Sequence, residues 1–144
     1  MSGPRHADLV GVLSAVERAQ IAKLREVSEK EAQIRRLLLD LSEQQVRNTH
    51  LPEDQLSGPR ASGADVLWQG WVAQTRHELQ IRLARTLASK AQARDAVRLA
   101  FGRRRAAEAL HDDEMRKGKQ KRVKSADSME QGQALFSTAL RGPR

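Results

Sequence analysis

Residues 10–41 read VGVLSAVERAQIAKLREVSEKEAQIRRLLLDL, and this stretch decides the fold. It contains two interleaved heptad series and no proline. The series are Val10, Glu17, Leu24, Glu31 and Leu38, and Leu13, Gln20, Val27, Ile34 and Leu41. Because most of these positions are apolar, the pattern predicts a helix that pairs with a second helix. We expect this first helix over residues 6–48.

The remainder of the chain predicts one more long helix. Residues 49–63 contain two prolines and two glycines, which favours a loop. Residues 64–122 lack proline and carry recurring apolar side chains from Leu67 to Phe101, which favours a helix. Two helices joined by one loop fold back antiparallel. The prediction is therefore an all-α antiparallel two-helix coiled-coil hairpin over residues 1–124, followed by a flexible, disordered C-terminal tail at 125–144.

Composition disfavours several classes of protein. Ala, Glu, Lys, Leu and Arg make up about half of the chain, which is typical of long helices. Four aromatic residues are too few for an ordinary small-molecule pocket, and the lack of cysteine excludes disulfides and thiolate chemistry. No apolar run is long enough to span a membrane, and no signal-peptide core is recognisable near the N-terminus. We expect a cytoplasmic protein without membrane insertion.

Catalytic and metal-binding patterns are missing from the sequence. None of the histidines at positions 6, 50, 77 and 111 has another at helical spacing, so they predict no metal site. The segment His111-Asp112-Asp113-Glu114 is interpreted as surface charge, because consecutive helical residues point in different directions. Residues 57–63 contain glycine but not the Gly-Lys-Ser/Thr step of a phosphate-binding loop. We therefore expect no catalytic residue, no metal and no cofactor.

Basic charge is concentrated toward the C-terminus. The formal net charge is +8, and the excess lies in Arg103-Arg104-Arg105 and in residues 116–124. This surface fits an acidic protein partner, a plain solvated helix face or a nucleic acid. No aromatic residue is interleaved with the basic run, which argues against stacking on bases. Since residues 1–50 are nearly charge-balanced, we expect little in the first helix to neutralise the arginine triplet.

Both tryptophans stand at the start of the second helix, in Trp68-Gln69-Gly70-Trp71-Val72. A layer of two helices is too thin to bury both rings. The sequence predicts that one ring packs on Leu38 and Leu41 and that the other is exposed. An exposed tryptophan is a frequent anchor for a binding partner.

The chain resembles the FliJ-type component of the flagellar type III export apparatus and its virulence-system relatives. The resemblance rests on three motifs in residues 8–122: Trp68-Gln69-x-Trp71-Val72 after the loop, Gln33 followed by Leu37-Leu38-Leu39-Asp40-Leu41, and Phe101-x-Arg103-Arg104-Arg105 followed by Ala107 to Arg116. The family is a two-helix coiled coil similar to the stalk subunit of rotary ATPases. Tyrosines that it often has near the end of its first helix are replaced here by Leu41 and Gln45.

The resemblance implies a non-enzymatic coupling protein with three kinds of partner: a hexameric export ATPase, the cytoplasmic domain of the export gate, and export chaperones. It implies a cytoplasmic location at the inner membrane, held there through partner proteins. The implied ATPase-binding residues are Arg18, Arg103, Arg104 and Arg105. The implied gate-binding residues are Leu38, Leu41, Trp68, Trp71, Val72 and Thr75. Two alternatives stay open: a basic coiled coil that binds nucleic acid, and a secretion chaperone or scaffold without ATPase contact.

Overall fold

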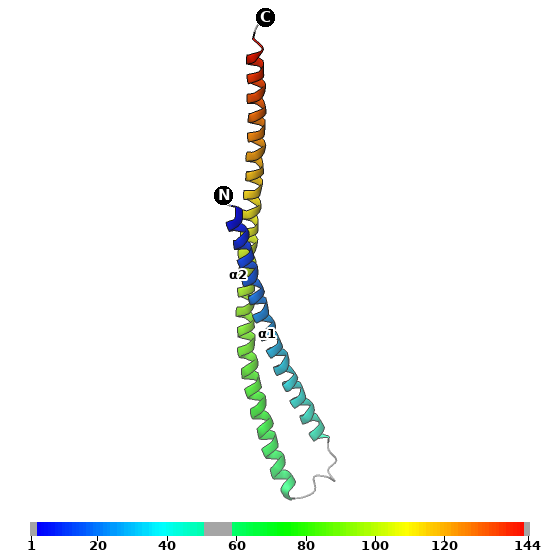
Figure 1. The fold of residues 1–144 in the computed structure, drawn as a ribbon. Coiled ribbons are helices and arrows are strands. Elements are labelled where there is room, and N and C mark those ends of the chain that lie inside the picture. Colours follow the sequence, from blue (N-terminus) through cyan, green and yellow to red (C-terminus); the bar gives the residue numbers. More distant parts are fainter. Residues whose placement is uncertain (1–2, 51–58, 143–144) are drawn as a thin grey trace. The chain divides into compact units, whose positions relative to one another are not determined.

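The computed structural model describes residues 3–50 and 59–142. They form two α-helices, α1 (Gly3–Thr49) and α2 (Pro59–Leu140), and no strand occurs among these described residues (Figure 1). This confirms the prediction of an all-helical chain with two helices.

Both helices are longer than the sequence predicts. α1 begins at Gly3 rather than at residue 6, and α2 begins at Pro59 rather than at residue 64. Proline suits the first position of a helix because its missing N–H has no intrahelical acceptor there and its φ angle is already helical. Of the predicted loop at 49–63, Thr49 and residues 59–63 are helical, and residues 51–58 lie outside the described part of the chain.

The prediction of a disordered tail was wrong for residues 125–140, which belong to α2. This segment has no proline, and half of its residues are Ala, Leu, Gln or Met, which have good helix propensity. The side chains described from residue 121 onward are all exposed, so the helix persists there without packing against α1.

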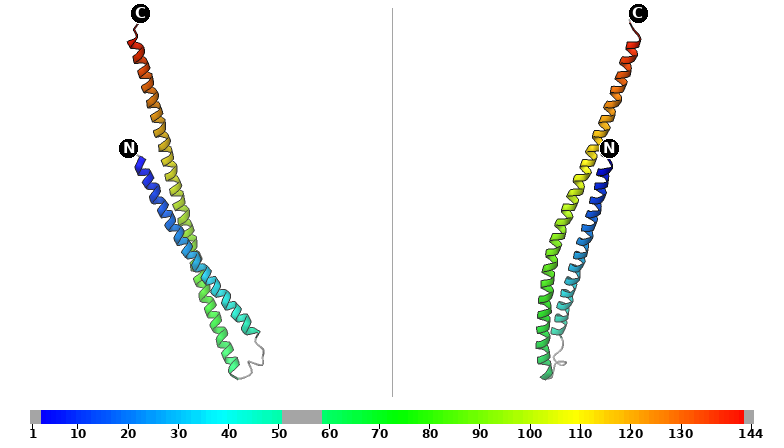
Figure 2. Two further views of the ribbon diagram at one scale, coloured as in Figure 1. Left: turned by 45° about the vertical axis from the view of Figure 1, so that its right-hand side comes forward. Right: turned by 60° about the vertical axis from the view of Figure 1, so that its left-hand side comes forward.

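The chain divides into two compact units. The terminal unit comprises Met1–Glu17 and Ala100–Arg144, and the central unit comprises Arg18–Leu99. In the central unit, α1 runs antiparallel to α2, as both views of Figure 2 show. Its apolar core is a cluster of Leu41, Val72 and Leu79, with Ile34, Leu38 and Trp68 packed against it.

The heptad series predicted from residues 10–41 forms the inner face of α1. All ten of its positions are buried or half-buried. Large apolar residues off the series, such as Val12, Leu37 and Leu39, are exposed. Burial at these positions confirms that the heptad series is the pairing seam of α1 within each unit.

No helix in the described part of the chain is long and apolar enough to cross a membrane.

Candidate interaction surfaces

The two tryptophans differ in their surroundings, as the sequence predicts. Trp68 is half-buried and packs against the cluster of Leu41, Val72 and Leu79, whereas Trp71 is 55% exposed. Leu67, one helical turn before Trp71 and on the same side of α2, is also exposed. Trp71 and Leu67 therefore form an apolar surface on the central unit.

Most of the implied gate-binding residues belong to the core of the central unit instead of its surface. Leu41 and Val72 are 5% and 2% exposed, so their side chains are occupied by packing between α1 and α2. Leu38 and Thr75 are half-buried. Of the six residues, only Trp71 presents most of its side chain to solvent.

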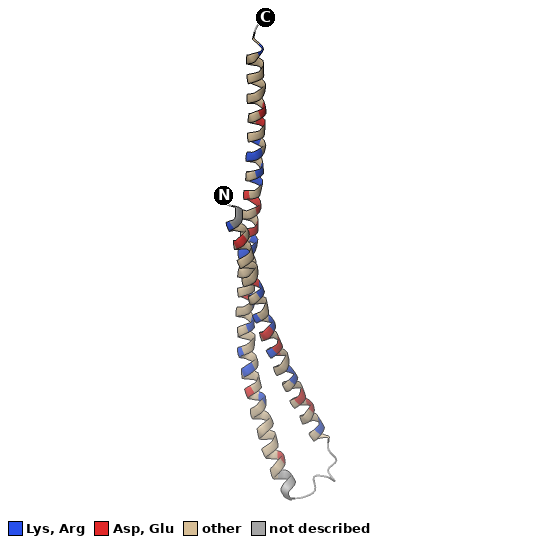
Figure 3. Ribbon diagram, in the orientation of Figure 1, with Lys and Arg blue, Asp and Glu red and all other residues tan. Residues whose placement is uncertain are grey.

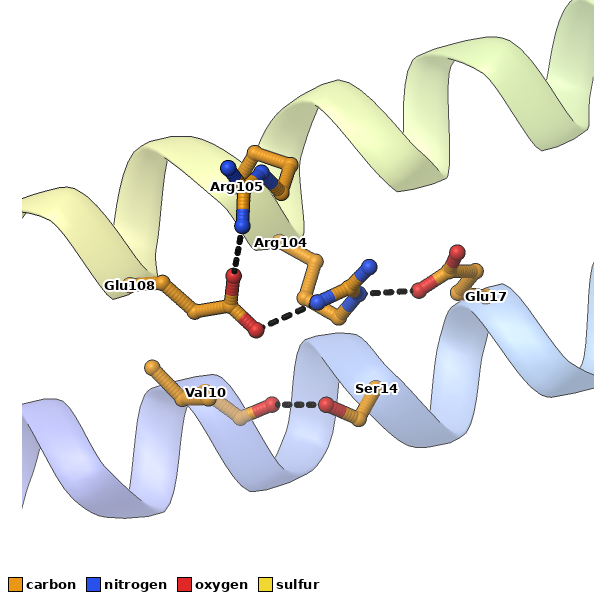
Figure 4. Close-up of polar contacts among 6 residues, drawn as sticks. All are labelled: Val10, Ser14, Glu17, Arg104, Arg105 and Glu108. Atoms are coloured by element: carbon orange, nitrogen blue, oxygen red, sulfur yellow. Dashed lines mark hydrogen bonds and ion pairs between the residues drawn. The ribbon is translucent and has the colours of Figure 1, made fainter.

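Arg104 contradicts the expectation that α1 cannot neutralise the arginine triplet. Figure 4 shows its guanidinium between Glu17 of α1 and Glu108 of α2, and it forms an ion pair with each carboxylate. The hydrogen bond to Glu17 raises the pKa of the Arg104 guanidinium further, and the bond to Glu108 acts in the same direction. The guanidinium carbon also lies 5.3 Å from the centroid of the Phe101 ring, a cation–π distance. Arg104 thus holds α1 and α2 together in the terminal unit.

The other implied ATPase-binding arginines are exposed. Arg105 donates to Oε2 of Glu108 at 3.2 Å and keeps 65% of its side chain exposed. Arg103 is exposed and makes no ion pair within residues 3–50 and 59–142. Arg18 is exposed on α1 and belongs to the central unit, whereas the triplet belongs to the terminal unit.

The second basic stretch, residues 116–124, is a solvent-facing part of α2. Lys117 lies 2.8 Å and Arg116 3.9 Å from Asp113, and hydrogen bonding to Lys117 lowers the pKa of that carboxyl. Lys119, Lys121, Arg122 and Lys124 follow on exposed positions. Figure 3 shows the stretch as blue bands on α2. This surface carries more unneutralised positive charge than the arginine triplet does.

Polar contacts between the helices were missed in the sequence analysis. Lys90 lies 2.5 Å from Oε2 of Glu31, and Arg76 donates to Oε1 of Gln45 at 2.5 Å. Hydrogen bonds from Lys90 and then from Arg35 hold the pKa of Glu31 below its ordinary value. The signal was present, because Glu17 and Glu31 interrupt an otherwise apolar heptad series and basic residues recur with the same period in the second helix.

The acidic segment at 111–114 is only partly surface charge. His111, Asp113 and Glu114 are half-buried, and Nδ1 of His6 on α1 lies 2.9 Å from Oε2 of Glu114. No cluster of three or more His, Cys, Asp or Glu side chains suited to a metal ion occurs in the described ranges.

No family model, no curated protein and no solved structure matches this chain.

Proposed function

We propose that this chain is a non-enzymatic coupling component of a flagellar or related type III protein export apparatus. The terminal unit would enter the central pore of the hexameric export ATPase. The central unit would contact the cytoplasmic domain of the export gate, and export chaperones would be further partners. The chain would act in the cytoplasm, at the inner membrane through these partner proteins.

The observation that carries the proposal is the basic surface of α2. Nδ1 of His6, near the start of α1, lies 2.9 Å from Glu114, and α2 continues through the basic residues 116–124 to Leu140. A helix with cations on several sides suits a partner that surrounds it, because a flat surface reaches only some of them. Arginine and lysine also pair favourably with carboxylates that line a pore.

Gate binding is proposed for the surface of Trp71 and Leu67. Trp71 retains its place in the implied gate-binding set because its ring is exposed. Leu41 and Val72 act indirectly in this proposal, since their packing holds the helix that presents Trp71.

Stimulation of the export ATPase by the purified chain tests the ATPase contact. We expect Arg103→Glu with Arg105→Glu to reduce stimulation, because both side chains are largely exposed. The matched control is Arg82→Glu with Arg85→Glu, which reverses two exposed charges on α2 in the central unit. Equal stimulation by both variants and the unchanged chain would contradict the pore contact.

Nucleic-acid binding is the second candidate function, favoured by the exposed basic residues 116–124. It predicts affinity for duplex DNA or RNA that falls steeply as salt is added. Loss of that affinity on reversing Lys119, Lys121, Arg122 and Lys124, with ATPase stimulation intact, would support this candidate over the first. A chaperone or scaffold without ATPase contact predicts no stimulation by any form of the chain.

A further inference from the structure

Polar and apolar residues alternate along one heptad position of each helix. On α1 this position is occupied by Glu17, Leu24, Glu31, Leu38 and Gln45. On α2 the antiparallel series is Arg104, Val97, Lys90, Leu83 and Arg76. The polar members contact one another as Glu17–Arg104 in the terminal unit, and as Glu31–Lys90 and Gln45–Arg76 in the central unit.

These contacts share one register. Successive contacts are two heptads apart on both helices, and the heptad between them holds aliphatic residues on both sides. In the central unit those residues are Leu24 and Val97, and Leu38 and Leu83, and all four are half-buried. Polar positions of α1 thus correspond to polar positions of α2, and aliphatic positions to aliphatic ones.

Glu31 is the most buried polar residue in this alternating series. It is 8% exposed, and both carboxylate oxygens are bonded, Oε1 to Arg35 at 2.9 Å and Oε2 to Lys90 at 2.5 Å. A carboxylate at such a position is strongly unfavourable once its partner is removed.

A shift of one heptad in either direction would place Glu31 and Lys90 opposite aliphatic residues. Glu31 would come opposite Leu83 or Val97, depending on the direction, and Lys90 opposite Leu38 or Leu24. The α2 face after Leu87 would oppose the shift only weakly, because much of it is alanine. Small residues fit many registers and specify none of them strongly.

A shift of two heptads would give Glu31 a basic partner again but would disrupt the core. Glu31 would then come opposite Arg76 or Arg104, which are also basic. The same shift would take Leu41 away from Val72 and Leu79, which form the apolar cluster of the central unit. The cluster therefore opposes the one shift that the charge pattern permits.

We propose that the alternating polar contacts are the register determinant of the helix pair: they exclude shifts of one heptad, and the Leu41–Val72–Leu79 cluster excludes shifts of two. Single polar residues at core positions of coiled coils fix register in this way, at some cost in stability. The inference concerns α1 and α2 alone, and it holds whether or not the chain engages an ATPase.

The test exchanges residues without changing composition. In Lys90→Val with Val97→Lys, Glu31 faces valine and Leu24 faces lysine. In Leu24→Glu with Glu31→Leu, the mismatch is made from the α1 side. Combining all four substitutions restores matched partners in the original register: a carboxylate at position 24 then faces an ammonium at position 97, and positions 31 and 90 are both aliphatic. All four positions lie in the central unit and outside its apolar cluster.

Register is read from the distance between two spin labels. The chain has no cysteine, so labels can be attached at Ala32→Cys on α1 and Ala73→Cys on α2, both exposed sites. A shift of one heptad moves the helices past each other by about 10 Å.

We expect each twofold exchange to shift or broaden the distance distribution, or to lower Tm by about 5 °C or more. The fourfold exchange should recover both the original distance and most of the Tm. An unchanged distance and Tm in the twofold variants would overturn the inference. The inference would also be overturned if the distance and Tm of the fourfold variant were no closer to the original values than those of the twofold variants. Register would then not depend on matched positions.

Discussion

Lys90 of α2 lies 2.5 Å from Oε2 of Glu31 on α1, and the two residues are 59 positions apart in the chain. The contact explains why a glutamate is tolerated on the inner face of a helix pair whose apolar core is small. It also ties the stability of the central unit to the ionisation of one carboxyl group.

The first prediction concerns pH. The pKa of Glu31 is lower in the folded chain than its ordinary value of 4.5, because Lys90 and then Arg35 donate to its carboxylate. The stabilisation from this shift is therefore fully present above about pH 4.5 and is lost as pH falls through the lowered folded value. We expect Tm to fall on acidification below about pH 4.5, and to fall less in Glu31→Gln, which starts from a lower Tm at pH 7. Thermal unfolding followed by circular dichroism between pH 3 and 7 measures both. Identical dependence of Tm on pH in the two chains would contradict a stabilising role for the ionised Glu31 carboxylate.

The second prediction concerns the apolar cluster. Leu41→Ala should lower the free energy of unfolding by about 2–5 kcal/mol, because a buried leucine leaves a cavity when shortened. Leu38→Ala should cost less than Leu41→Ala, since Leu38 is only half-buried. The control is Leu39→Ala, an exposed leucine between the two, which should change stability by less than about 0.5 kcal/mol. Urea denaturation ranks the three variants, and equal costs for all three would argue against this core.

The third prediction separates the tryptophans. Trp68→Ala should destabilise the chain by about 2–3 kcal/mol, below the range for a fully buried ring because Trp68 is half-buried. Trp71→Ala should leave unfolding within about 0.5 kcal/mol of the original and reduce binding to the gate domain. In the single-tryptophan forms, acrylamide should quench Trp71 more strongly than Trp68. Equal quenching of the two rings would remove the basis for assigning them different roles.

The fourth prediction concerns the arginine triplet. Arg104→Glu should lower helicity and Tm, because the new carboxylate would face both Glu17 and Glu108. Arg103→Glu makes the same charge reversal at an exposed site one residue earlier, and it should leave helicity and Tm unchanged. Circular dichroism of the two variants provides the comparison. Reversing the whole triplet is a poor test of partner binding for the same reason, since that change alters the fold as well as the surface.

The fifth prediction concerns the end of α2. Removal of residues 125–144 should leave Tm within about 1 °C, because the described side chains beyond residue 121 are exposed and bury nothing against α1. The far-ultraviolet signal of the full chain should exceed that of the shortened chain by the contribution of helix up to Leu140. A large drop in Tm would mean that this segment packs on another part of the chain.

By itself the sequence determined the helical class, the two long proline-free stretches that form the helices and the heptad face of α1. These follow from local propensity and periodicity, which depend on neighbours only a few residues away. The same pattern predicted that one tryptophan packs and one is exposed, but it did not say which, because that depends on where the partner helix lies around α2. Only the tertiary structure showed that Trp68 faces the Leu41 cluster, and that Glu17 and Glu31 meet Arg104 and Lys90. Those contacts join residues far apart in the chain, and the register of α1 on α2, which brings them together, is a property of the two helices jointly.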